Sequence, residues 1–168
     1  LEEMDSARTL AWVDAQNELT LSHLADIEQR EPLRRRIEEL WDFPRWTAPV
    51  RRGERLFYTK NDGLQNQDVL YVMEGEDGTP EVLLDPNTLS EDGTVALSSW
   101  NLSKDGKYLG YLIARAGSDW NEIYVMDLEA KEIVDEPIKW VKFSGLSWKD
   151  DGFYYSRYDE PEEGEELS

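Results

Sequence analysis

The sequence predicts a mainly β chain that is preceded by an N-terminal α-helical arm, and the β part is expected to be the first blades of a β-propeller. Three observations predict this fold class. Apolar residues recur at helical spacing up to about residue 42. Short β-branched and aromatic runs, separated by Asp-Gly pairs, follow from about residue 50. A strand–turn–strand pattern then recurs within that second part.

Residues 1–42 are predicted to form the helical arm. The first helix can be capped by Asp5 or Ser6. Its apolar side chains fall near one face: Leu10, Val13, Leu21, Leu24 and Ile27. Pro32 suits the first turn of a second helix, where a proline ring is tolerated. The apolar face of that helix carries Leu33, Ile37, Leu40 and Trp41.

Residues 43–168 are predicted to form the first two to three blades of the propeller. Pro44 and Pro49 bracket an extended segment, because proline does not continue a helix. Six runs then have the length and composition of strands, at 56–58, 69–72, 82–84, 108–111, 123–126 and 153–155. Asp-Gly pairs are typical of tight hairpin turns, and they begin at residues 62, 77, 92, 105 and 151.

An internal repeat supports the propeller. The string WNLSKDGKY at 100–108 is echoed by LSWKDDGFY at 146–154 and more faintly by VRRGERLFY at 50–58. The glycines of the three strings are 53 and 46 residues apart, near the length of one blade of about four strands. Propellers have about four to eight blades. The β part is therefore expected to be incomplete, with the acidic stretch 160–166 a solvated loop or a cut end.

The charge of the chain limits its partners. There are 37 acidic residues against 18 Lys and Arg, which gives a net charge of −19. Such a surface repels nucleic acid and anionic membranes, so neither is an expected partner. No apolar run reaches the roughly 18 residues of a membrane-spanning helix. The lack of a signal-peptide pattern favours the cytoplasm, while the opening at Leu1-Glu2 leaves a periplasmic location open.

No catalytic, metal or cofactor site is predicted within this chain. The string nearest to the Gly-x-Ser-x-Gly turn of a hydrolase contains Gly145 and Ser147 but lacks the second Gly, and a blade strand is the favoured interpretation. The single His23 lies within the first helical pattern and is expected to be structural or surface-exposed. One His and no Cys do not make a zinc site. No glycine loop suited to a phosphate is present.

Tryptophan is the most informative residue type in the β part. Four tryptophans lie in or beside the predicted strands: Trp100, Trp120, Trp140 and Trp148. Packing between blades is favoured over stacking on a ligand, because large aromatic side chains contribute most of their energy by burial.

Several linked strings resemble the prolyl oligopeptidase family of serine peptidases. They are GLQNQ at 63–67 running into VLY at 69–71, LDPN at 84–87 with LSEDGTVAL at 89–97, GSDW at 117–120, and VKFS at 141–144 followed by Trp148. Leu1-Glu2 also resembles the end of the family's DPYRWLE opening. The resemblance covers residues 1 to about 158, and oligopeptidase B, a related enzyme, is less similar around residues 63–71.

The resemblance implies an architecture and an activity. A helical arm packs on an α/β-hydrolase domain, and a seven-bladed propeller caps that domain and admits only short peptides. The hydrolase domain carries Ser, Asp and His and cleaves on the carboxyl side of proline. That domain is absent from this chain, so the chain alone is expected to be inactive. The implied partners are short proline-containing peptides and the missing hydrolase domain or remaining blades.

Two substrate-binding residues carry over from the family. Phe143 matches an aromatic residue that lines the outer substrate subsite, and Asp119 matches an acid that pairs with an arginine of the hydrolase domain. Taken alone, the residues also fit a core Phe in a strand and an Asp in a turn. Two other functions stay open for the chain, a stand-alone binding module of propeller blades and a purely structural piece. Apolar faces on residues 1–42 favour the peptidase, because a free propeller does not need them.

Overall fold

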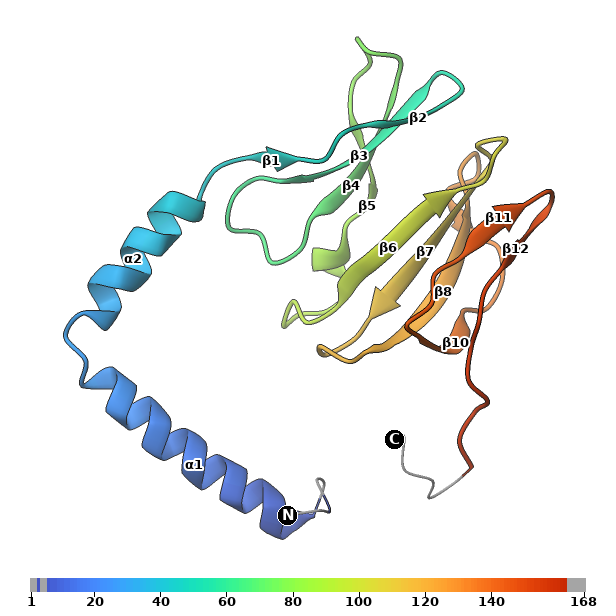
Figure 1. Cartoon of the computed structure of the whole chain (residues 1–168). Coiled ribbons are helices and arrows are strands. Elements are labelled where there is room, and N and C mark those ends of the chain that lie inside the picture. The colour runs from blue at the N-terminus through green and yellow to red at the C-terminus, as the bar shows by residue number, and fades with distance from the viewer. Residues whose placement is uncertain (1–2, 4–5, 163–168) are drawn as a thin grey trace. The chain divides into compact units, whose positions relative to one another are not determined.

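The structure is a computed structural model that describes residue 3 and residues 6–162. The chain divides into two compact units, Leu1–Phe43 and Pro44–Ser168. The first unit holds both α-helices and the second holds all the strands of the described residues (Figure 1). No helix of the described part is long and apolar enough to cross a membrane.

The first unit contains two helices, α1 (Ala7–Ala25) and α2 (Arg30–Trp41). Ser6 caps α1 as predicted, and its Oγ accepts a hydrogen bond from the backbone N–H of Thr9. Asp5, the other predicted cap, lies outside the described residues. Pro32 occupies the first turn of α2. The first helix is shorter than its apolar pattern suggests, because it ends at Ala25 and Ile27 lies in the link to α2.

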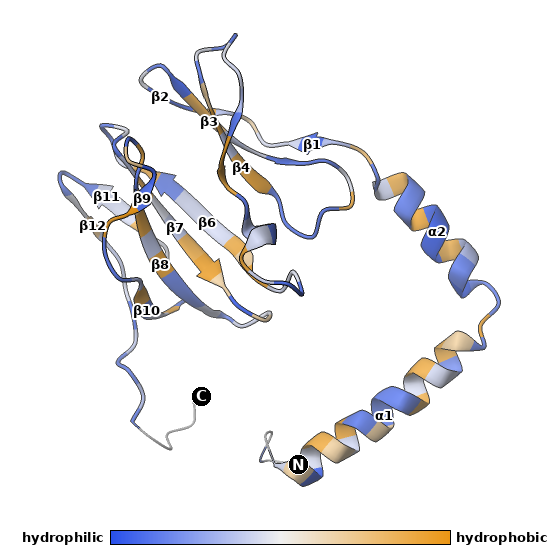
Figure 2. Ribbon diagram, turned by 180° about the vertical axis from the view of Figure 1, so that it is seen from behind, coloured by the Kyte–Doolittle hydropathy of each residue, from blue (hydrophilic) through white to orange (hydrophobic). Residues whose placement is uncertain are grey.

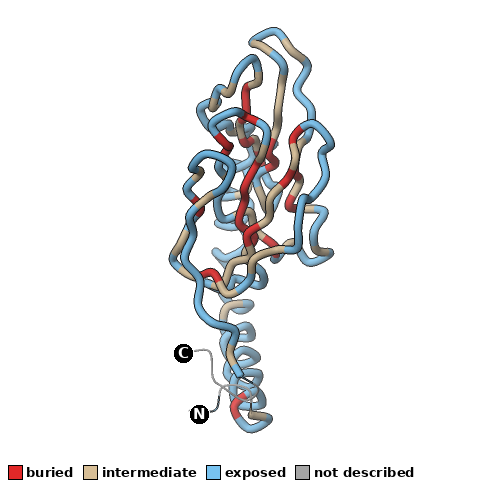
Figure 3. The backbone as a smooth tube through the Cα atoms, turned by 90° about the vertical axis from the view of Figure 1, so that its right-hand side faces the viewer, coloured by how far each residue is buried: buried red, intermediate tan, exposed pale blue. Residues whose placement is uncertain are grey.

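The apolar faces of both helices are exposed. The four apolar side chains of α2 are each more than half exposed: Leu33, Ile37, Leu40 and Trp41. Leu10 and Leu21 of α1 are also more than half exposed, and Thr9 is the buried residue of that helix. Figure 3 shows the contrast between the mostly exposed helices and the buried strands. A row of exposed apolar side chains of this length marks a surface that normally meets another protein surface.

The second unit contains three antiparallel sheets. In the first, β1 and β2 pair with successive parts of β3, and β4 and β5 follow in order. Its strands are β1 (Arg45–Trp46), β2 (Val50–Arg52), β3 (Arg55–Asn61), β4 (Val69–Glu74) and β5 (Glu81–Leu84). A short helix, η1 (Pro86–Thr88), leads from this sheet to the next.

The second sheet repeats this meander. Strands β6, β7 and β8 pair in order, and β9 and β10 both pair with β8. Its strands are β6 (Ala96–Leu102), β7 (Tyr108–Ala114), β8 (Trp120–Asp127), β9 (Glu132–Ile133) and β10 (Ile138–Lys142). The third sheet is the hairpin of β11 (Ser147–Lys149) and β12 (Gly152–Tyr154). Four successive antiparallel positions make one propeller blade, so two sheets have blade topology and the third has two of its strands.

Each of the three echoed strings forms a hairpin: β2–β3, β6–β7 and β11–β12. Gly53 and Gly106 hold the positive φ angles in the first two turns, 59° and 72°. In the third, the positive φ of 52° falls on Asp150 and Gly152 already belongs to β12. The Asp-Gly pair at Asp92 and Gly93 does not form a hairpin turn, because it lies in the link between the first two sheets.

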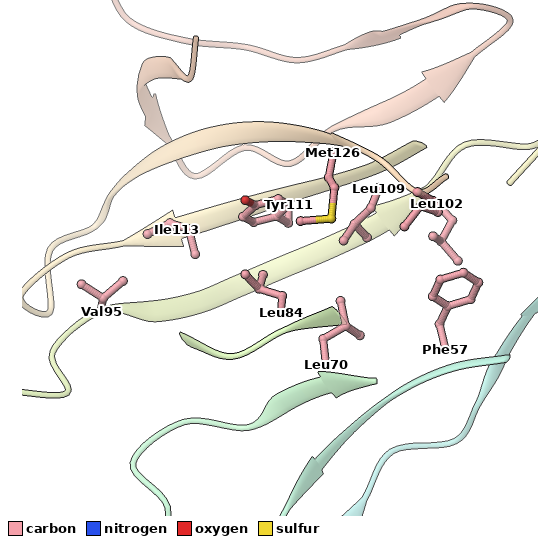
Figure 4. Packing of buried hydrophobic residues seen from close by; sticks show 10 residues of the cluster. Phe57, Leu70, Leu84, Val95, Leu102, Leu109, Tyr111, Ile113 and Met126 are labelled. Atoms are coloured by element: carbon pink, nitrogen blue, oxygen red, sulfur yellow. The ribbon is translucent and has the colours of Figure 1, made fainter. Parts of the chain in front are cut away.

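Two clusters of buried residues join the sheets face to face. Side chains of the first sheet, such as Phe57 and Leu70, pack against Leu109 and Tyr111 of the second (Figure 4). The other face of β7 presents Leu112, which packs with residues of the third sheet. The second sheet is therefore covered on both faces, and Figure 2 shows the resulting run of hydrophobic residues along β7.

Gly110 shows how closely the third sheet approaches. A Cβ atom at this position would lie 2.5 Å from Cδ2 of Leu146 and 3.2 Å from Cζ2 of Trp148. These distances are shorter than a normal contact, so the glycine allows the hairpin to pack directly on the β7 backbone. The close approach explains why a residue with a poor strand propensity lies in the middle of the most buried strand.

Candidate functional site

One end of the second unit gathers the segments that carry the predicted site residues. In the second sheet, β7 and β10 end there and β6 and β8 begin there. The register pairs at that end are Ala96–Ala114, Ala114–Asn121 and Trp120–Lys142. The β3–β4 connection meets the same end, because Gln67 Nε2 donates to the carbonyl of Gly93 just before β6. Residues 62–68, 115–119 and 143–146 thus surround one surface.

Asp119 closes the β7–β8 connection and is exposed. The loop is fixed by its own hydrogen bonds, since the Ser118 backbone N–H donates to Arg115 O and Ser118 Oγ accepts from the Trp120 N–H. Asn121 Nδ2 donates to the carbonyl of Asp119 at 2.9 Å. Within the described residues no ion pair holds the Asp119 carboxylate, which leaves it available to an outside cation.

The nearby cation Arg115 is occupied by another acid. Its Nε and Nη2 donate to Glu122 Oε2 at 3.2 and 3.1 Å, and the Tyr124 hydroxyl donates to the same oxygen at 2.8 Å. The hydrogen bond to Glu122 raises the pKa of Arg115. Burial, together with the hydrogen bond between its own hydroxyl and Glu122, raises the pKa of Tyr124. The three groups form a closed network, and it does not involve the Asp119 carboxylate.

Phe143 follows directly after β10 and projects from the surface. It is 81% exposed, and its φ angle of 51° lies in the left-handed region, which a non-glycine residue rarely adopts. Lys142 Nζ lies 5.3 Å from the centroid of its ring and 5.1 Å from that of Trp120. The interpretation of Phe143 as a core residue of a strand is therefore wrong. The buried neighbour Val141 is the last apolar residue of β10 to face inward.

Both predicted site residues line the same open depression, of about 490 Å³. Asp119 and Ser118 of the β7–β8 connection line it together with Phe143 and Ser144, which follow β10, and with Ser98 of β6. The lining offers a carboxylate, an aromatic ring and hydroxyl groups. These groups can bind and orient a peptide, and none of them is an activated nucleophile.

A second depression of about 550 Å³ adjoins the first, and both are lined by Ser98 and Ser99. Its other lining residues come from β3, the β3–β4 connection and β6: Thr59, Asn66, Gln67, Asp68, Leu97 and Trp100. Sequence reasoning used the string at 63–67 only as a family signature and missed Asn66 and Ser98 as surface groups. The sequence carried no local signal for either residue, because their placement depends on how β6 pairs with β7 and on how Asn87 holds the β3–β4 connection.

The candidates for other chemistry lie elsewhere in the fold. Ser147 is the first residue of β11, so it does not sit on the strand-to-helix turn of a hydrolase nucleophile. His23 is an exposed residue in the last turn of α1. Among the described residues, no group of three or more His, Asp or Glu side chains could hold a metal ion.

Comparison with known proteins identifies the family. The whole chain, residues 1–168, matches the family described as prolyl oligopeptidase, N-terminal beta-propeller domain. The chain belongs to the prolyl oligopeptidase family. It is 43% identical over its full length to a prolyl endopeptidase of Elizabethkingia meningoseptica, and 32% identical over 96% of its length to one of Dictyostelium discoideum. It spans about a quarter of each of these relatives, 24% and 27%.

Solved structures of prolyl oligopeptidases share the fold. One, from a structural and mechanistic study of two prolyl endopeptidases, has a TM-score of 0.87 and 33% identity, over 93% of this chain and 24% of its own. Another is prolyl oligopeptidase B from Galerina marginata bound to a 35mer hydrolysis and macrocyclization substrate. It has a TM-score of 0.83 and 26% identity, over 97% of this chain and 26% of its own. The predicted fold class, a mainly β part of a propeller with two helices, is confirmed.

Proposed function

We propose that this chain is the N-terminal region of a serine peptidase that cleaves short peptides on the carboxyl side of proline. The observation that carries the proposal is the depression lined by Asp119 and Phe143, the two positions for which the family resemblance implies a substrate-binding role. Relatives that match the chain along its length are named prolyl endopeptidases.

The proposed division of labour follows the two parts of the chain. Residues 1–42 form the arm that packs on the hydrolase domain, and the exposed apolar faces of α1 and α2 support this role. Residues 43–168 form the first two to three blades of the propeller, which limits access to short peptides. The hydrolase domain supplies the nucleophile, acid and base, and this chain alone does not hydrolyse peptides.

In this proposal Phe143 and Asp119 act by binding. The exposed Phe143 ring packs against an apolar substrate residue two or three places before the scissile bond. The Asp119 carboxylate pairs with an arginine of the hydrolase domain at the edge of the same depression. The exposure of both side chains, and the lack of an ion pair to Asp119 within the described residues, support these roles.

The test compares the purified chain with the full-length protein that contains it. A chromogenic substrate with proline before the reporter measures the activity of both. The full-length protein should release the reporter and lose this activity with a serine-directed inhibitor, and the chain alone should release none. Turnover that co-purifies with the chain alone and survives the inhibitor would contradict the proposal.

A further inference from the structure

Side-chain amides at the end of β3 and in η1 hold the β3–β4 connection in place. Asn61 Nδ2 donates to Gln65 O at 3.0 Å and to Asp68 Oδ1 at 3.1 Å. Asn87 Oδ1 and Nδ2 bond the backbone N–H and carbonyl of Gln67 at 2.9 and 3.0 Å. A loop fixed at both ends in this way presents its remaining side chains in a set position.

Asn66 is the exception in this connection. Its side chain is exposed and makes no hydrogen bond to any described residue, although it lies between committed neighbours. Its amide rests on the backbone of Gly93, where an added Cβ would lie 2.1 Å from Nδ2. Gly93 also has a φ of 68°, so glycine at this position both permits the backbone and leaves room for the Asn66 amide.

Ser98 lies in a β-bulge of β6, the strand that lines the same depression as Asn66. Leu97 pairs with Ile113 and Ser99 pairs with Leu112, so Ser98 is an extra residue in β6. A bulge redirects the side chains around it, and bulges are common beside binding sites. Ser98 and Ser99 are both exposed, and no described residue hydrogen-bonds their hydroxyl groups.

The uncommitted groups form a continuous path. Asn66, Ser98 and Ser99 line the depression of about 550 Å³, and Ser98 and Ser99 also line the depression that holds Phe143 and Asp119. The three side chains are neutral, and each has donors and acceptors. An extended peptide offers backbone donors and acceptors about every 3.3 Å, whatever its sequence. Neutral amides and hydroxyls on a fixed surface suit such a main chain.

We infer that Asn66, Ser98 and Ser99 form a second peptide subsite, which binds the main chain of substrate residues beyond the one that contacts Phe143. The inference rests on the proposed function, because it takes the substrate to be a peptide that occupies the Phe143 depression. The subsite makes binding depend on peptide length rather than on side-chain identity.

The test uses the full-length enzyme and the double variant N66A/S98A. Two substrates carry the same reporter after proline: a blocked dipeptide, and a peptide extended by six neutral residues on its amino side. The variant should raise KM for the extended peptide about 5- to 150-fold, the effect of about two lost hydrogen bonds. Its kcat for the extended peptide should stay at the wild-type value, and KM should rise less for the dipeptide than for the extended peptide.

Thr79→Ala is the matched control. Thr79 is an exposed polar residue in the β4–β5 connection, at the opposite end of the first sheet. This variant should leave KM unchanged for both substrates. Melting temperatures of the two variants should equal that of the wild type, because the replaced side chains are exposed.

Each outcome decides a different point. A normal KM for the extended peptide in N66A/S98A overturns the subsite and leaves the proposed function intact. Equal losses on both substrates also overturn it, because they indicate a general effect on the enzyme. A wild-type enzyme that cleaves neither substrate overturns the proposed function and the subsite together.

Discussion

Replacing Phe143 by alanine separates a binding residue from a structural one. Its side chain is 81% exposed, so truncation removes little buried surface. The expected loss of unfolding free energy is less than about 1 kcal/mol, including the contact with Lys142. Truncation of a core phenylalanine costs about 3–5 kcal/mol. The ring should contribute to substrate binding instead, because an apolar substrate residue would cover the exposed face of Phe143.

The expected kinetic effect follows from that burial. Full burial of a large apolar side chain stabilises a complex by about 1.5–3 kcal/mol. Phe143→Ala should therefore lower kcat/KM for peptides that reach the ring by about 1–3 kcal/mol, roughly 5- to 150-fold. A blocked dipeptide that does not reach Phe143 should be cleaved almost as before. Remote contacts of this kind can improve binding or the rate of the chemical step.

The assay measures kcat/KM for long and minimal substrates together with the melting temperature. Phe57→Leu is the control, because Phe57 is fully buried between the first two sheets. It should lower the melting temperature and leave the ratio of the two kcat/KM values unchanged. Equal losses on both substrates with a much lower melting temperature for Phe143→Ala would refute the binding role.

Three further predictions follow from the same contacts. Gly110→Ala should lower the free energy of unfolding by about 1–3 kcal/mol, because its Cβ would overlap Leu146; an unchanged denaturant midpoint would contradict this packing. Lys142→Met should raise KM for long peptides without changing kcat, and Lys142→Arg should keep KM at the wild-type value. Equal KM values in the two variants would show that the cation at position 142 does not support binding by the Phe143 ring. Burial and the neighbouring Tyr124 raise the pKa of Tyr111 to about 12. The stability from the neutral phenol is present below about pH 10 and lost as pH rises through about 12, and Tyr111→Phe should reduce this alkaline loss in denaturation curves.

The strands were predictable because their signals are local. A β-branched or aromatic run that is flanked by turn residues leaves little choice of conformation. Five of the six predicted runs lie wholly within strands, and the sixth, 153–155, extends one residue past the end of β12. The repeat was also predictable, because each echoed string contains the turn of one hairpin, and the contacts nearest each turn join residues close in the sequence. The cap at Ser6 and the place of Pro32 follow from single-residue chemistry.

The features that the sequence did not predict depend on residues that are far apart in the sequence. The turn at Asp150 places its positive φ one residue before the Asp-Gly pair, because the register of β11 and β12 makes Gly152 a strand residue. The bulge at Ser98 depends on how β6 pairs with β7, and no local pattern in β6 reports it. The exposure of Phe143 depends on the end of β10, which its pairing with β8 determines.

The tryptophans divide in the same way. Trp100 and Trp148 pack against the two clusters of buried residues, as predicted for packing between blades. Trp120 and Trp140 belong to neither cluster and instead meet each other edge to face, with ring centroids 5.9 Å apart. Tyr158 adds a third ring at 5.4 Å from Trp120, and its backbone N–H bonds the carbonyl of Trp140. The segment after β12 thus returns to β10.

The placement of the candidate site follows from how the faces of the second sheet are used. Residues along β7 alternate between the two neighbouring sheets, with Tyr111 toward one and Leu112 toward the other. Both faces are thereby occupied by packing, and Gly110 leaves no space between β7 and the third sheet. A ligand can then reach this sheet only at its edges or at the ends of its strands. The end that collects Asp119, Phe143 and the bulge at Ser98 also has exposed polar groups that make no hydrogen bond to the described residues. Substitutions in the loops at that end can therefore alter binding. The stability of the sheet depends instead on the buried residues between the sheets, which lie away from that end.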